Sequence, residues 1–335
     1  MTEAAALQPA DFNFTPDAAR ARKLDGAVRV GLAKSLRIVF AALEPPFHAD
    51  ESRASALLGA IEAGPVRPAV FGAYVDLVLA LIEERERDIQ RLIDEILALT
   101  APASEGLNIL DLTDEALGAG QAARYGRLLI DDVDFTLGPV ALPSRARAKA
   151  KLGDGLALLD ASAPATAAEV RALVREIVLT SAESNPSGAL FDGASTFSLW
   201  GAVALNADRL GDRLTTAVAL AHETAHNLLF GLALGGRLTE NDDEDLHPSP
   251  LRSDPRPMEG VAHAVYVTAR MIHTLEALLG SGVLDQDEAD KARARLDQHR
   301  AGYADSLAVV LANARFTPAG AATFKAMRAA MTEDG

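Results

Sequence analysis

One spacing of residue types in the sequence can build a metal site: HETAH at residues 222–226, the pattern H-E-x-x-H. Residues four apart on an α-helix lie one turn apart on the same face, so both imidazoles can reach one metal ion. Glu223 then lies beside the metal, where a carboxylate can take a proton from bound water or hold a reacting group. If the histidines were only buried side chains, each unpaired group would cost about 1–3 kcal/mol. We therefore predict that His222 and His226 bind a metal ion.

A third ligand has to come from another segment. The strongest candidates are Glu259 and His263, which are four residues apart and therefore on one face of a helix predicted over residues 258–279. A zinc peptidase with a downstream glutamate would use Glu259, whereas a three-histidine site would use His263. The other histidines are far from the motif, in an acidic loop or deep in a helix: His48, His299, His247 and His273. The spacing leaves Glu259 and His263 both open.

Two arginines, Arg252 and Arg256, stand in a proline-rich loop just before that helix. A guanidinium matches a carboxylate through two parallel hydrogen bonds. In a peptidase such an arginine would bind a substrate carboxylate or an oxyanion, and in an oxygenase it would anchor a 2-oxoacid cosubstrate. The alternative is an ion pair with the acidic run at residues 240–245. Of the two, Arg256 is the stronger candidate because prolines on both sides fix its backbone.

Three segments taken together resemble a known family. They are GAVALN at residues 201–206, AHETAHNLLFGL at 221–232 and SPLRSDPRPMEGVAHAVYV at 249–267. This combination is similar to the H-E-x-x-H peptide-modification proteins found beside genes for ribosomally made peptide natural products (RiPPs), which are iron- and 2-oxoglutarate-dependent peptide β-hydroxylases. The similarity is most specific over residues 195–275. One departure is Leu251, which stands where the family often has tryptophan.

The resemblance implies roles for particular residues. His222, His226 and His263 match the metal-binding positions, and Arg252 and Arg256 match the basic positions suited to the far carboxylate of 2-oxoglutarate. Fe(II) with three protein ligands leaves positions for 2-oxoglutarate and dioxygen. Glu223 would then be a pocket residue and not a general base. Three imidazoles depart from the usual set of two histidines and one carboxylate, so Glu259 stays open as a ligand.

Two other functions compete with peptide hydroxylation. In a zinc metallopeptidase, Glu223 would activate zinc-bound water as general base, and Glu259 would be the natural third ligand. A non-catalytic helical interaction protein with structural histidines is a third hypothesis, but no repeat or exposed heptad surface supports it.

The elements that must position these residues are mostly helical. The pattern predicts a mainly α fold with a small β-sheet (α+β), in which an N-terminal helical layer packs on a zincin-like H-E-x-x-H helix core. We expect an N-terminal helical region over residues 1–105 and a metal-binding catalytic region over 106–335. Thr166 and Glu169 have the spacing of a capping box that opens a helix. Helices are predicted over residues 15–43, 50–61, 68–99, 166–179, 214–234 and 258–279, and strands over 107–112, 128–137, 156–159 and 196–206.

Composition limits the partners. There is no cysteine, so zinc-thiolate sites, Fe–S clusters and thiol nucleophiles are excluded. With 32 Lys and Arg against 47 Asp and Glu the net charge is -15, which argues against nucleic-acid and anionic-membrane partners. No secretory signal or spanning segment is recognisable. We therefore expect a cytoplasmic enzyme whose partner is a precursor peptide.

Overall fold

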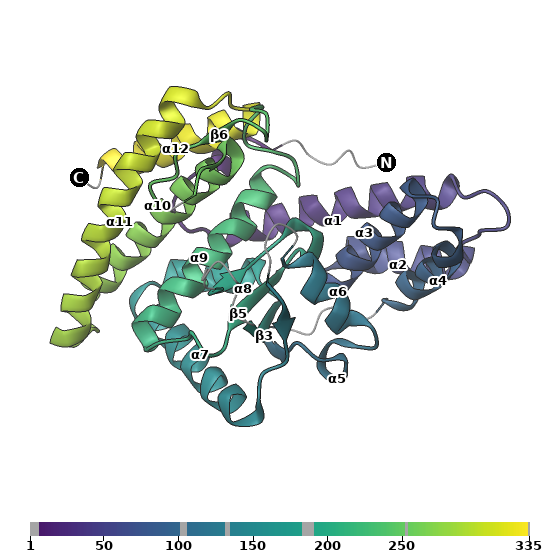
Figure 1. The fold of residues 1–335 in the computed structure, drawn as a ribbon, viewed down its shortest axis with the longest axis horizontal. Coiled ribbons are helices and arrows are strands. Elements are labelled where there is room, and N and C mark those ends of the chain that lie inside the picture. Colours follow the sequence, from purple (N-terminus) through teal and green to yellow (C-terminus); the bar gives the residue numbers. More distant parts are fainter. Residues whose placement is uncertain (1–6, 101–105, 131–134, 183–190, 252–253, 334–335) are drawn as a thin grey trace. The chain divides into compact units, whose positions relative to one another are not determined.

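The chain is mainly helical with a small mixed β-sheet, which confirms the predicted fold class. The computed structural model describes residues 7–100, 106–130, 135–182, 191–251 and 254–333 (Figure 1). In this part of the chain no helix combines the length and the apolar character that crossing a membrane requires.

The elements follow one another in a helix-rich order with short strands between. The helices are α1 (Ala18–Ala41), α2 (Glu51–Ala63), α3 (Pro68–Ile82), α4 (Glu86–Ala98), α5 (Asp114–Leu117), α6 (Gln121–Leu128), α7 (Leu142–Ser162), α8 (Pro164–Leu173), α9 (Arg213–Leu232), α10 (Met258–Gly280), α11 (Gln286–Asn313) and α12 (Pro318–Glu333), with 3₁₀ turns at Pro9–Phe12 and Phe197–Leu199. The strands are β1 (Asn108–Asp111), β2 (Leu137–Gly138), β3 (Glu176–Ala182), β4 (Gly193–Ala194), β5 (Ala202–Asn206), β6 (Leu246–His247) and β7 (Arg256–Pro257).

The chain forms two compact units, each assembled from several segments. The larger pieces of the first are Arg22–Ala148 and Leu173–Arg209, and the second consists of Ala6–Ala21, Lys149–Ala172 and Leu210–Gly335. Residues on both sides of position 105, where the sequence suggested a boundary, contribute to the first unit. Both predicted metal-binding helices, α9 and α10, lie in the second.

The first unit contains the main sheet, with strand order β1-β3-β5-β4. The first three strands are parallel, with Ile177 of β3 opposite Ile109 on one side and Val203 on the other. The short strands β4 and β2 add antiparallel pairs to β5 and β3. All five residues of β5 are buried, as expected for a strand covered on both faces.

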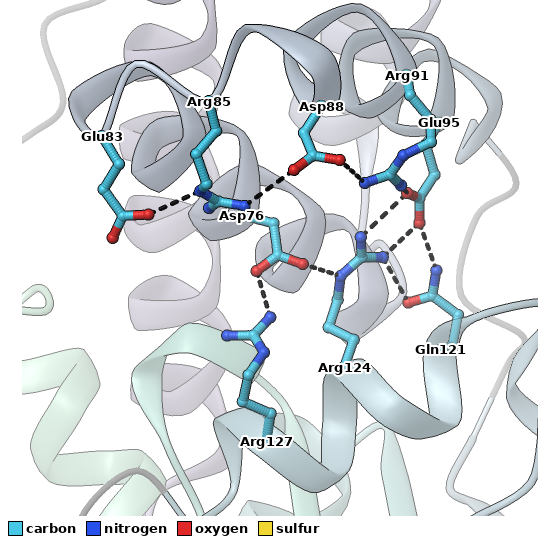
Figure 2. Close-up of polar contacts among 9 residues, drawn as sticks. All are labelled: Asp76, Glu83, Arg85, Asp88, Arg91, Glu95, Gln121, Arg124 and Arg127. Atoms are coloured by element: carbon cyan, nitrogen blue, oxygen red, sulfur yellow. Dashed lines mark hydrogen bonds and ion pairs between the residues drawn. The ribbon is translucent and has the colours of Figure 1, made fainter.

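A network of ion pairs joins α6 to α3 and α4 in this unit (Figure 2). Its centre is Arg124, only 6% exposed, whose Nε donates to Asp76 at 2.7 Å and whose Nη1 and Nη2 donate to Glu95 at 2.5 and 3.1 Å. Gln121 completes the group, accepting from Arg124 at 3.0 Å and donating to Glu95 at 2.8 Å. Arg91, on the outside, is 61% exposed.

We expect Arg124→Met to lower the free energy of unfolding by about 2–3 kcal/mol, because it leaves two partly buried carboxylates without their shared donor. Arg91→Met removes an exposed member of the same network and should cost less than about 0.5 kcal/mol. Urea unfolding followed by circular dichroism compares the two variants. Equal losses of stability would show that burial does not set the strength of this network.

Several predicted elements are wrong, and local chemistry explains them. Residues 156–159, predicted as a strand, belong to α7. The glycine before them, Gly155, does not mark a turn. A Cβ at this position would lie 2.7 Å from Cγ2 of Thr216, so the glycine permits close packing of α7 on α9. Residues 176–182 form β3 and not the end of a helix, as their β-branched content favours. The helix predicted over 68–99 is broken by Glu84, whose φ is 53°. A strand was also predicted over residues 128–137. Of the residues in this range that the structure describes, only Leu137 is in a strand.

Candidate metal centre

The first two candidate ligands lie on α9, as the sequence predicts. Asp212 caps the start of this helix by accepting a hydrogen bond from the Thr215 amide at 2.8 Å. Apolar residues such as Leu228 and Leu229 are buried on the inner side and fix the helix in the unit. The helix ends at Leu232, two residues before the predicted end, and the chain then turns through Leu234 with φ 49°.

His222 and His226 are neighbours on one face of α9. Their ring centroids are 5.0 Å apart, as expected for residues separated by one helical turn. Both side chains are partly exposed, whereas Glu223 between them is 5% exposed. An oxygen of Glu223 lies 3.8 Å from Nε2 of His222. The H-E-x-x-H motif therefore presents two imidazoles with a buried carboxylate at their side.

The third histidine comes from α10, which packs against α9. The His263 ring stacks on His226 with centroids 5.8 Å apart and an interplanar angle of 24°. Phe230, one turn beyond His226, contacts both rings, with centroid distances of 6.4 and 5.6 Å. The packing of the two helices thus brings His263 beside the motif, and the Phe230 ring lies next to both histidines.

Glu259 faces a different set of partners. Its carboxylate accepts hydrogen bonds from the Leu238 amide at 2.9 and 3.1 Å, and from the amide and hydroxyl of Thr239 at 2.9 and 2.8 Å. It also lies 3.2 Å from Nε2 of His263. Burial alone would raise the pKa of Glu259, but the hydrogen bonds from His263, Leu238 and Thr239 lower it to about 2. This carboxylate is therefore ionised and held by the protein itself.

The His226 ring lies beside both His222 and His263, but this adjacency does not amount to a metal-binding geometry. Within the described residues, no three His, Asp or Glu side chains converge in a geometry that could hold a metal ion. Imidazoles that share one metal at about 2.1 Å have ring centroids roughly 5 Å apart, close to the observed 5.0 and 5.8 Å. The nearly parallel rings of His226 and His263 would have to rotate about their side-chain torsions. The donor types and two of the three ring separations are thus those of a histidine metal site, but the described structure does not bring three ligands into a binding geometry.

The contact between Glu259 and His263 has the form of a carboxylate that orients a histidine ligand. We expect Glu259→Gln to weaken the affinity for Fe(II) or Zn(II) by roughly 10–100-fold without abolishing it, because the amide supports the ring less well. Anaerobic titration with a competing chelator measures this. Complete loss of metal binding in Glu259→Gln, together with normal binding in His263→Ala, would make Glu259 the ligand instead.

The basic loop residues are only partly described. Arg252 lies outside the described residues. Arg256 is in β7, directly before α10, and its Nε is 3.2 Å from the exposed carboxylate of Asp254. The sequence suggested an ion pair between an arginine of this loop and the acidic run at residues 240–245, whereas the partner of Arg256 is Asp254. A Cβ at Gly260 would lie 3.8 Å from Cβ of Arg256, so the arginine stem lies over the first turn of α10.

The remaining histidines lie in other surroundings. His273 packs edge-on against Phe14, and burial lowers the pKa of His299 on α11. His48 is exposed in the loop before α2. His247 lies in β6, paired in register with Arg256. Sequence reasoning missed this pairing and the position of Phe230, although the four-residue spacing from His226 to Phe230 was a visible signal.

Comparison with known proteins adds no family to this picture. A scan against protein-family models and a search of curated proteins found no match.

Proposed function

We propose that this chain is a non-haem, Fe(II)- and 2-oxoglutarate-dependent oxygenase that hydroxylates the β-carbon of a residue in a ribosomally made precursor peptide. The observation that carries the proposal is the side-by-side arrangement of His222, His226 and His263, while Glu259 is occupied by backbone amides. That arrangement favours three histidines over two histidines and a glutamate. It is also the ligand set that the sequence resemblance implies.

In this proposal the three histidines hold Fe(II), and Glu259 orients His263 through their 3.2 Å contact. Bound iron and 2-oxoglutarate supply the oxidising chemistry, in which dioxygen, 2-oxoglutarate and a C–H bond give succinate, carbon dioxide and an alcohol. Phe230 lies against the His226 and His263 rings and would give one side of the site an aromatic surface. Glu223, buried beside His222, is placed to orient that ring or to accept a hydrogen bond from the substrate.

Arg256 is the proposed anchor for the distal carboxylate of the cosubstrate, and Arg252 is its proposed companion. In support, Arg256 stands at the start of the helix that carries His263, with its stem over Gly260. A guanidinium can bind a carboxylate with two hydrogen bonds. We further propose that the enzyme acts in the cytoplasm in RiPP biosynthesis, on a peptide and not on nucleic acid or membrane, which agrees with the net charge of -15.

One observation favours a zinc metallopeptidase as the second candidate. Glu223 lies 3.8 Å from His222, and in a peptidase this carboxylate would take the proton from zinc-bound water. Such an enzyme would cleave a peptide without consuming 2-oxoglutarate.

Product analysis separates the two functions. Purified protein is given Fe(II), ascorbate, 2-oxoglutarate, oxygen and a candidate precursor peptide. We expect succinate to form faster when the peptide is present, and the peptide to gain one oxygen atom. His222→Ala should lose both activities, and the matched surface control His48→Ala should keep them. Peptide cleavage with Zn(II), and no succinate with Fe(II), would favour the peptidase.

A further inference from the structure

We propose that His247 is a second carboxylate-binding residue, which acts with Arg256 on the distal carboxylate of the 2-oxoacid cosubstrate. This inference rests on the proposed function and extends it to a residue that the motif does not contain. It assigns recognition of the cosubstrate to both strands of the hairpin, with His247 from β6 and Arg256 from β7.

The first support is the strand register. In the antiparallel pair β6–β7, His247 lies directly opposite Arg256. Directly opposed residues of an antiparallel pair project from the same face, with Cβ atoms about 4.5–5.5 Å apart. An imidazole and a guanidinium thus stand together immediately before the helix that carries His263.

The second support is unsatisfied polar atoms. Nε2 of His247 and Nε of Arg256 are both buried and have no hydrogen-bond partner among the described residues. Buried polar groups without partners are costly, and two of them on opposed residues point to a missing acceptor. Asp254 is 3.2 Å from Nε of Arg256, but the contact is an ion pair without a hydrogen bond and Asp254 is 58% exposed. A ligand carboxylate can replace it.

The third support is the start of α10. This helix begins directly after β7, so Arg256 lies two residues before its first residue, Met258. His263 follows one to two turns later on the same helix, so a ligand held by the hairpin lies toward the proposed metal. A dicarboxylate 2-oxoacid has a second carboxylate for the hairpin to bind, whereas a monocarboxylate 2-oxoacid has none.

The test is a binding titration of the full chain, loaded anaerobically with Fe(II), so that no turnover is needed. The probes are 2-oxoglutarate and pyruvate, a 2-oxoacid without a distal carboxylate. We expect His247→Ala to raise the Kd for 2-oxoglutarate by about five- to twentyfold, which corresponds to one lost hydrogen bond, and to leave the Kd for pyruvate unchanged. His247→Gln places an amide N–H near the position of Nε2 and should restore most of the affinity. Asp254→Asn removes the competing carboxylate and should tighten 2-oxoglutarate binding.

The outcomes distinguish this inference from the proposed function. If wild type binds 2-oxoglutarate in a manner that depends on Arg256, but His247→Ala and His247→Gln bind like wild type, the role of His247 is overturned and the oxygenase stands. If His247→Ala weakens pyruvate and 2-oxoglutarate equally, the residue acts on the fold and the inference fails. If wild type binds no 2-oxoglutarate, the proposed function fails and this inference with it. Thermal midpoints of all variants show whether each has folded.

Discussion

His226→Ala should reduce the affinity for Fe(II) or Zn(II) by more than about a hundredfold and leave the helix content almost unchanged. Even the loss of a partner outside the metal shell costs roughly 10–100-fold, and His226 is the central ring of the three, in contact with both His222 and His263. The side chain is partly exposed, so its removal leaves little cavity in the core. Metal content after gel filtration and far-UV circular dichroism measure the two quantities.

His48→Ala is the matched control, because it removes an imidazole from an exposed loop of the other unit. It should bind metal like wild type. Full metal occupancy in His226→Ala would remove the basis for a metal centre on α9.

Glu169→Gln should lower the free energy of unfolding by about 3–5 kcal/mol, because it leaves two buried arginines without their common counter-charge. Glu169 is 0% exposed, accepts from Arg20 at 2.5 Å, and also pairs with Arg270 of α10. Its carboxylate further accepts from the Asp17 amide at 3.0 Å. This glutamate thus joins the N-terminal segment to α10 within the second unit.

Thermal unfolding measures the loss, which we expect as a fall in Tm of roughly 6–20 °C. The control is Glu276→Gln, which breaks the exposed pair with Arg300 at 2.7 Å and should change stability by less than about 1 kcal/mol. If the two variants melt at the same temperature, the buried network does not stabilise the unit as described.

The helices of the site are the part of the fold that the sequence predicts best. The observed α10 (Met258–Gly280) differs by one residue from the predicted 258–279, because its signals are local: a proline before the first turn and apolar residues at helical spacing. The prediction for α9 is nearly as close, because this helix begins one residue before and ends two residues before the predicted 214–234, and the Asp212 cap at its start is also a local signal. Strands were harder to predict, because the apolar pattern of a short run such as residues 156–159 is compatible with either a short strand or part of a buried helix.

Contacts between distant segments could not be predicted. Thr166 and Glu169 have the spacing of a capping box, yet α8 begins at Pro164 and the Glu169 carboxylate binds Arg20 and Arg270 instead. The partners of Glu259 are similarly remote, since Leu238 and Thr239 precede it by about twenty residues and reach it only through the fold. For the same reason, the sequence left Glu259 and His263 open as alternatives.

The most direct test of the central claim is a spectroscopic titration of the anaerobic Fe(II) protein with 2-oxoglutarate. We predict a metal-to-ligand charge-transfer band that saturates with the cosubstrate in wild type, persists with weaker metal affinity in Glu259→Gln, and is lost in His263→Ala. A wild-type protein that retains Zn(II) tightly and gives no such band at any concentration of 2-oxoglutarate would contradict the account.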